Sequence, residues 1–245
     1  MHIEKYNRNS VGHLFEHYTR DPKIYKYQKH INPELKSQNY TLGNSTLIGM
    51  EKYKQILNTP GLKIHNRQDV ITLVDVILTL PKPESFPAKQ EREFFKVGFQ
   101  FLLNKFCDGK EDGNFVLCVC HRDEDKNNSQ PHIHFSFIPI HDQKVCAKKV
   151  ITRQMLCTLH QEASNYFYNH FGFDVGILNG ATKEGNLTVP QLREQTKKYN
   201  ELIKSNEKLK IENEQLKSEL AENMHNLKIW QQEEGITPSF DIEKI

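Results

Sequence analysis

Two histidines, His132 and His134, lie two residues apart in the apolar run Pro131-His-Ile-His-Phe-Ser-Phe-Ile-Pro139. The run has the length and composition of a β-strand. Side chains alternate between the two faces of a strand, so both imidazoles point the same way, with about 6.7 Å of rise between them. Two imidazoles on one face suit a divalent metal ion, and the sequence therefore predicts a metal site on this strand.

A second apolar segment, Val116-Leu-Cys-Val-Cys-His121, also ends in a histidine. The polar stretch of residues 123–130 leads from it to the histidine pair. Two strands joined by such a loop are expected to pair antiparallel. His121 would then lie at the mouth of the loop, close to the other two imidazoles.

Three converging imidazoles are costly to bury unless a metal ion or a shared hydrogen-bond network satisfies them. The set lacks the cysteines of a closed structural zinc site, and a carboxylate ligand widens the choice of metal to manganese, iron or nickel. Glu124 is the expected carboxylate ligand, and Asp123 and Asp125 are alternatives. An open site of this kind can polarise a phosphoryl oxygen and stabilise a leaving group. Water as the nucleophile would make the chain a hydrolase, whereas a tyrosine or histidine would form a covalent nucleotidyl intermediate.

The elements that must position these residues follow from hydrophobic periodicity. Residues 68–80 are rich in β-branched side chains and predict a long central strand that ends at Pro81. Helical spacing predicts amphipathic helices over residues 87–105 and 152–171, the second ending at Gly172. Strands are predicted at 115–121 and 132–138. We therefore predict an α+β domain over residues 1–180, with an antiparallel sheet, flanking helices on one face and the metal site on the other.

The C-terminal region has a different pattern. Residues 192–230 contain no glycine or proline and are rich in Lys, Glu, Gln and Asn. A seven-residue repeat places Tyr199, Asn206, Asn213, Leu220 and Leu227 at a positions, and Leu202, Leu209 and Leu216 at d positions. Leucine at d with asparagine at a is typical of a parallel two-stranded coiled coil. The alternative is a single helix that packs on the domain. The predicted boundaries are a linker at 181–190, a helical or coiled-coil segment at 191–232 and a tail at 233–245.

Composition sets further bounds. The formal net charge is +2, and 37% of the residues are hydrophobic and 26% charged, as in ordinary globular proteins. Basic and aromatic residues gather in about the first 65 residues, a distribution that suits nucleic acid. The cysteines form no C-x-x-C pair and are expected to be free, buried thiols of a reducing compartment. No secretory segment or membrane-spanning run is found, so we expect a cytoplasmic protein without membrane insertion.

Four sequence blocks carry a resemblance to a known family. The first is Gly12-His-Leu-Phe-Glu-His17-Tyr-Thr-Arg20, the second joins Ile31-Asn-Pro33 to Asn39-Tyr-Thr-Leu42, the third joins His121-Arg-Asp-Glu124 to Pro131-His-Ile-His134, and a weaker fourth joins Ala147-Lys-Lys149 to Thr152-Arg-Gln-Met-Leu156. In order and spacing, over about residues 11–175, they resemble the Mob/Pre (MobV-type) plasmid relaxases, which are His-hydrophobic-His endonucleases.

The resemblance implies a role for each matching residue. The metal ligands would be His121, Glu124, His132 and His134, holding a divalent ion, with manganese expected and magnesium or another ion possible. His17 would attack the scissile phosphate and leave a phosphoramidate link to the DNA 5′ end. Arg20 would support the active site, and Tyr40 would lie near it. Tyr18 stands where the family commonly has asparagine, and it is the alternative nucleophile.

The implied function is nicking of one strand at the transfer origin of a plasmid or other mobile element, which starts conjugative mobilisation. The DNA would be a single strand beside a hairpin or duplex, with phosphate contacts from Lys26, Lys29, Lys36, Lys148, Lys149 and Arg153. The resemblance also implies the conjugation machinery as a partner, and the coil would pair two copies. Rival functions are a rolling-circle replication initiator or transposase with the same chemistry, a nonenzymatic DNA-binding dimer with a structural metal, and a hydrolase of small phosphodiesters.

Overall fold

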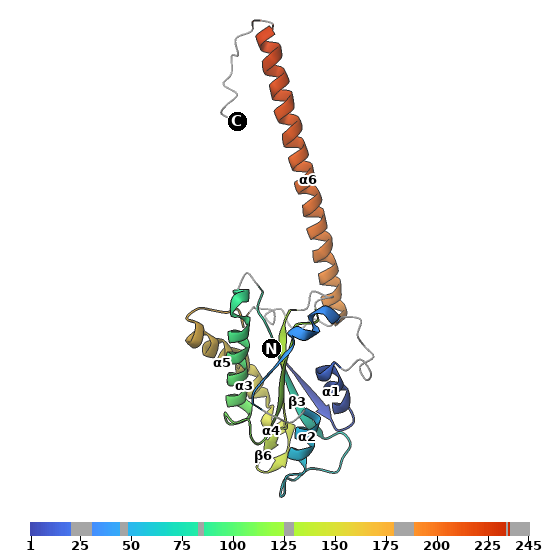
Figure 1. Ribbon diagram of the computed structural model, residues 1–245, viewed down its shortest axis with the longest axis vertical. Coiled ribbons are helices and arrows are strands. Elements are labelled where there is room, and N and C mark those ends of the chain that lie inside the picture. The colour runs from blue at the N-terminus through green and yellow to red at the C-terminus, as the bar shows by residue number, and fades with distance from the viewer. Residues whose placement is uncertain are drawn as a thin grey trace. The chain divides into compact units, whose positions relative to one another are not determined.

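The computed structural model describes residues 1–20, 31–44, 49–82, 86–124, 130–178, 189–233 and 235. The chain divides into two compact units, Met1–Gly180 and Ala181–Ile245. The first unit consists of a β-sheet with helices packed on it, and the second contains one long helix (Figure 1).

A five-stranded antiparallel sheet forms the centre of the first unit, with the strand order β1-β3-β5-β4-β2. Its strands are β1 (His2–Asn7), β2 (Tyr40–Leu42), β3 (Ile71–Thr79), β4 (Phe115–His121) and β5 (His132–Phe137). A small hairpin, β6 (Ile140–His141) and β7 (Lys144–Val145), follows β5. The predicted antiparallel pair is confirmed, since β4 and β5 are neighbours in the middle of the sheet.

Two helices, α3 (Glu91–Phe106) and α5 (Arg153–Phe171), cover one face of the sheet (Figure 1). Their aromatic side chains, such as Phe94 and Phe167, pack with Phe135 and Phe137 into the main core. Gly98 permits this close packing, because a Cβ atom there would lie 2.2 Å from Leu78 on β3. A short 3-10 turn, η2 (Ala88–Gln90), precedes α3, and a single turn, α4 (Ala147–Val150), precedes α5.

The opposite face carries α1 (Val11–Thr19) and α2 (Gly49–Leu57). The sequence predicts helices on one face only, so the presence of α1 and α2 on the face with the histidines differs from the prediction. The reason is that the face with the histidines also carries apolar side chains, among them Leu73 and Val119, which pack against Phe15 and Tyr53. Burying them requires a second helical layer. The 3-10 turn η1 (Pro33–Gln38) leads into β2.

Both predicted helices of the first unit form close to their predicted bounds. Thr152 begins α5 as its N-cap, with Oγ1 accepting a hydrogen bond from the Met155 N–H at 3.1 Å, and Gly172 ends it in the left-handed conformation. All five cysteines are free; Cys107, Cys118 and Cys120 are buried, whereas Cys157 is exposed.

The second unit contains α6 (Val189–Glu233), which spans the predicted coiled-coil segment. Four of its leucines, Leu202, Leu209, Leu216 and Leu220, are more than half exposed. Most of the predicted linker and tail lies outside the described residues. Across the described part of the chain, no helix is both long and apolar enough to cross a membrane.

Candidate active site

The pairing of β4 with β5 brings three histidines together. His121 is the direct cross-strand partner of His132, and Val119 is the partner of His134. The ring centroid of His121 lies 5.7 Å from that of His132 and 5.1 Å from that of His134, and the last two are 5.1 Å apart. All three side chains are buried. The sheet thus forms a compact cluster of imidazoles at the end of β4.

Helix α1 adds a fourth imidazole. Val11, Leu14, Phe15 and Tyr18 form the buried face of this helix, and they hold its last turn, with His17, against the sheet. Nε2 of His17 lies 3.3 Å from Nε2 of His134, and the ring centroids of His17 and His121 are 4.8 Å apart. The fold therefore brings His17, from the first sequence block, into contact with the histidine cluster.

Arg20 ends α1 in the left-handed conformation, with φ of 51°. Such a backbone is strained for a residue other than glycine and is often found at functional sites. The buried guanidinium lies 2.9 Å from Nδ1 of His17 and 2.9 Å from Nδ1 of His121. It also donates two hydrogen bonds, of 3.2 and 3.1 Å, to the Asp123 carboxylate. Arg20 therefore links α1 to the end of β4.

The two acidic residues after β4 have different environments. Asp123 is fully buried and pairs with Arg20, whereas Glu124 faces the imidazoles. Glu124 Oε1 lies 3.4 Å from Nε2 of His17 and 3.5 Å from Nδ1 of His121, and it also contacts Arg20. Burial alone would raise the pKa of Glu124, but hydrogen bonds from His121 and Arg20 outweigh it and lower the pKa. Glu124 is thus an anionic neighbour of the cluster, and Asp125 lies outside the described residues.

The cluster fits a metal ion. Two groups of three candidate ligands, one with His17, His121 and His134 and the other with His121, Glu124 and His132, have ligand atoms within 4.8 Å of one another. Among the described residues, no hydrogen-bond partner is found for the buried Nε2 of His121. The second group contains three of the four predicted ligands, and within it Nε2 of His132 lies 3.8 Å from Oε2 of Glu124.

Asp75 belongs to the site, although the sequence analysis does not predict it. It is fully buried on β3, and its carboxylate accepts hydrogen bonds from His134 Nδ1 (2.7 Å), the Tyr18 hydroxyl (2.6 Å) and Ser136 Oγ (2.9 Å). A carboxylate that binds one ring nitrogen of histidine turns the other nitrogen toward a metal. The available signal was a single acidic residue within the otherwise apolar run Ile71–Thr79.

The two tyrosines of the predicted site have their side chains on opposite faces of the sheet. The hydroxyl of Tyr18 is buried and bonded to Asp75 and Ser136, and burial raises its pKa well above the ordinary value. Tyr40 pairs with Cys120, so its side chain is on the face opposite His121. The structure does not bring Tyr40 into the cluster.

The predicted DNA-contact residues are spread over the domain. Lys36 donates from Nζ to the carbonyl oxygen of Arg20 at 2.8 Å, and so holds the end of α1. Lys148, Lys149 and Arg153 are exposed on α4 and α5, beyond the C-terminal end of β5, whereas the histidines lie at its N-terminal end. Lys26 and Lys29 lie outside the described residues.

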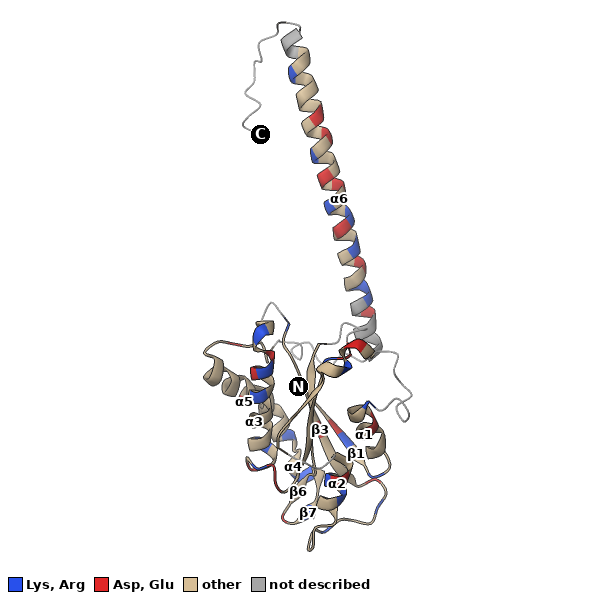
Figure 2. Cartoon of the chain, in the orientation of Figure 1, with Lys and Arg blue, Asp and Glu red and all other residues tan. Residues whose placement is uncertain are grey.

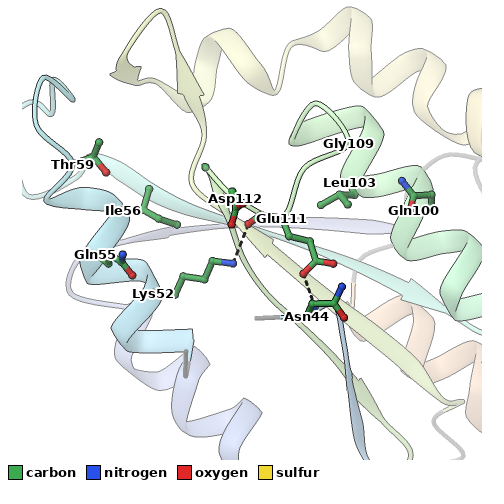
Figure 3. Close-up of a pocket in the computed structure, with 11 residues that line it drawn as sticks. Asn44, Lys52, Gln55, Ile56, Thr59, Gln100, Leu103, Gly109, Glu111 and Asp112 are labelled. Atoms are coloured by element: carbon green, nitrogen blue, oxygen red, sulfur yellow. Dashed lines mark hydrogen bonds between the residues drawn. The ribbon is translucent and has the colours of Figure 1, made fainter. Parts of the chain in front are cut away.

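A separate cavity of about 750 Å³ lies between α2 and the loop that joins α3 to β4 (Figure 3). Lys52 points across it and donates to the carbonyl oxygen of Glu111 at 3.0 Å, while the Glu111 carboxylate accepts a hydrogen bond from the Asn44 N–H (Figure 3). The Lys52 contact joins α2 to the loop, and the Glu111 carboxylate joins the loop to the residues after β2. None of the residues that line the cavity belongs to the histidine cluster.

The first unit has the fold of a relaxase domain. It is similar to the crystal structure of the MobM relaxase domain, which is bound to oriT DNA of plasmid pMV158 and to manganese, with a TM-score of 0.62 and 23% sequence identity. The match covers 79% of this chain and 96% of the MobM domain. A second MobM structure matches with a TM-score of 0.61 and the same identity.

The chain belongs to the plasmid recombination enzyme (Mob_Pre) family, whose family model matches residues 1–192. A plasmid recombination enzyme of Lactiplantibacillus plantarum is 30% identical over 54% of this chain, and one of Streptococcus agalactiae is 26% identical over 74% of it. In both cases the match covers 36% of the relative. The chain thus spans about a third of the length of these curated relatives.

Proposed function

We propose that this protein is a DNA relaxase that nicks one strand of a transfer origin and becomes covalently linked to the 5′ end through His17. The observation that carries the proposal is the contact between the last turn of α1 and the cluster, with His17 Nε2 3.3 Å from His134 Nε2. Family membership and the relaxase fold support it. The transfer origin is proposed as the substrate because the similar MobM domain is bound to oriT DNA.

The environment of His17 suits a nucleophile. Burial, with His121 and Arg20 nearby, lowers the pKa of His17 well below its usual range, so the imidazole is neutral at pH 7. One ring nitrogen contacts Arg20, and the other faces the cluster. In the proposed step a His17 nitrogen bonds to phosphorus, and the bond from phosphorus to the 3′ oxygen breaks. The proton lost by the imidazole balances the one gained by the 3′ hydroxyl.

A divalent ion, expected to be manganese, would be held by His121, Glu124, His132 and His134. When bound, it would polarise the phosphoryl oxygens and neutralise charge on the leaving group. Hydrogen bonds at the far side of two rings support this ligand set: His134 Nδ1 donates to Asp75, and His132 Nδ1 donates to the carbonyl oxygen of Gln130 at 3.0 Å. Both contacts turn Nε2 toward the cluster.

Tyr18 is the weaker candidate for the nucleophile. Its hydroxyl is committed to Asp75 and Ser136, and its raised pKa disfavours the phenolate that would attack phosphorus. The rolling-circle initiator and the transposase would share the same first step and differ in the DNA that is joined afterwards. In each case the protein would act on DNA in the cytoplasm and start the transfer or copying of a mobile element.

Intact-mass spectrometry tests the proposal. The protein is incubated with manganese and single-stranded DNA tiled across the region that flanks its gene, and His17→Ala and Tyr18→Phe are compared. We expect an oligonucleotide adduct in the unchanged protein and in Tyr18→Phe, and none in His17→Ala. Manganese binding should survive in His17→Ala, which separates a nucleophile from a metal ligand. Cleavage without an adduct would contradict the proposal and favour a hydrolase.

A further inference from the structure

We propose that a basic pocket at the end of β4 binds a backbone phosphate of the single-stranded DNA. The pocket has a volume of about 420 Å³ and lies between η1, the start of β2 and the start of α3. Its cationic residues are Lys89, Arg92 and Arg122. The inference rests on the proposed function, and it assigns DNA contacts to residues outside the histidine cluster.

The pocket is adjacent to the cluster along the chain but lies on the other face of the sheet, the face that carries the Tyr40 side chain. Arg122 directly follows His121, so one residue of β4 reaches the imidazoles and the next leaves the strand at the pocket. Arg92 lies in the first turn of α3, and Lys89 lies in the preceding turn η2. Figure 2 shows that basic and acidic residues occur together at the start of α3. A DNA strand that leaves His17 and passes around the end of β4 to the other face of the sheet would meet these side chains.

The two arginines are held in place by neighbouring groups. The guanidinium of Arg92 lies 4.9 Å from the ring centroid of Tyr40, a cation–π contact. Arg122 donates from Nη1 to Gln38 Oε1 at 2.6 Å, and its Nε lies 2.9 Å from Glu91 Oε1. A guanidinium has five N–H donors, so these two contacts fix the Arg122 side chain without using all its donors. Tyr40 therefore contacts the pocket through Arg92 and does not contact the histidine cluster through this side chain.

The charge of the pocket favours an anion. Three cationic side chains face one carboxylate, that of Glu91, and this carboxylate is paired with Arg122. Arginine is well suited to phosphate because its planar donors match the phosphate oxygens in pairs. A single strand can bend from the cluster into a recess, and such strands are bound through basic grooves that follow the backbone. A stiff duplex would reach the recess less readily.

Metal-free DNA binding tests this inference. The double variant Lys89→Gln/Arg92→Gln is compared with the control Lys54→Gln/Lys110→Gln, which removes the same charge from exposed residues of α2 and of the loop after α3. Fluorescence anisotropy with oligodeoxythymidine in EDTA gives the affinity at several salt concentrations. The logarithm of the binding constant falls linearly with the logarithm of the salt concentration, and each lost phosphate contact should make this slope less steep by about 0.7. We expect this reduction in the pocket variant and an unchanged slope in the control.

Equal slopes for the two double variants would overturn the inference, because the effect would then come from net charge alone. A larger loss on a duplex hairpin than on the single strand would overturn the assignment to single-stranded DNA. Circular dichroism of both variants checks that they fold. Failure of the proposed function would be a separate result. It would appear as the absence of a His17-dependent DNA adduct in the presence of manganese, whereas the role of the pocket is measured as DNA affinity without metal.

Discussion

Asp75 is the only charged residue of β3, and three side chains from other elements depend on it. Its carboxylate binds Nδ1 of His134 and the hydroxyl groups of Tyr18 and Ser136. A buried carboxylate is stable only when such donors satisfy it. At the scale of the residue, Asp75 therefore both orients a proposed metal ligand and fixes the helix that carries His17.

Replacing Asp75 by asparagine should weaken manganese binding. The amide cannot accept all three hydrogen bonds, so His134 loses the partner that orients its ring. Loss of such a partner typically reduces metal affinity about 10- to 100-fold. Isothermal titration calorimetry measures the effect, with Asp69→Asn as the matched control because Asp69 is exposed and pairs with the nearby Arg67. Equal affinities in the two variants would show that Asp75 does not orient a ligand.

At the scale of the element, α1 is attached to the sheet through Tyr18. Tyr18→Phe should lower the free energy of unfolding by about 1–3 kcal/mol, because the buried Asp75 and Ser136 lose a hydrogen-bond partner. Urea unfolding measures the loss, and Tyr168→Phe on the exposed side of α5 serves as the control. The variant should still form the DNA adduct, at a lower rate. Unchanged stability would mean that the hydroxyl does not hold α1 in place.

The start of α5 depends on a cap. Thr152→Ala removes the hydrogen bond from the Met155 N–H and should cost about 1 kcal/mol of unfolding free energy. Thr158→Ala, at an exposed position inside the same helix, should change stability by less than about 0.5 kcal/mol. Thermal unfolding of the two variants distinguishes them. Equal shifts would indicate that α5 does not need the cap.

The elements that the sequence predicts well are those with a local signal. The strands β4 and β5 show alternating or continuous apolar runs, and α3 and α5 show helical spacing, so their bounds follow within a few residues. The link between α1 and the cluster has no such signal, because His17 and His134 are 117 residues apart. The family resemblance brought His17 into the predicted site, whereas periodicity alone would have left it as a surface residue.

Long-range packing explains the remaining differences. No local pattern predicts that α1 and α2 cover the face with the histidines, because their buried apolar partners lie on β3, β4 and β7, far away in the chain. Tyr40 was expected near the site, but the register of β2 with β4 turns its side chain to the other face. The left-handed backbone of Arg20 depends on its contacts with Asp123 and His121, which are more than a hundred residues away in the chain.

At the scale of the whole molecule, α6 would join two copies of the chain. Basic and acidic residues are interspersed along it (Figure 2), and its leucines at d positions are exposed. Asn206 and Asn213 at a positions would face their counterparts in a parallel, in-register coil. Such a coil also places Glu212 opposite Lys217 of the second copy.

Analytical ultracentrifugation tests the coil. The double variant Leu209→Glu/Leu216→Glu places charges in the proposed seam and should be monomeric, whereas the unchanged protein should be a dimer. Gln215→Glu, outside the a and d positions, is the control and should remain dimeric. A monomeric unchanged protein would contradict the coil and support a single solvated helix.

The most direct test of the central claim is to locate the covalent bond between protein and DNA. The adduct formed with manganese is digested, and tandem mass spectrometry identifies the modified residue, before and after mild acid treatment. We predict that the nucleotide mass is on His17 and is lost in acid, because a phosphoramidate is acid-labile whereas a phosphotyrosine ester survives. A modification on Tyr18 that resists acid, or cleavage with no modified residue, would contradict a histidine relaxase.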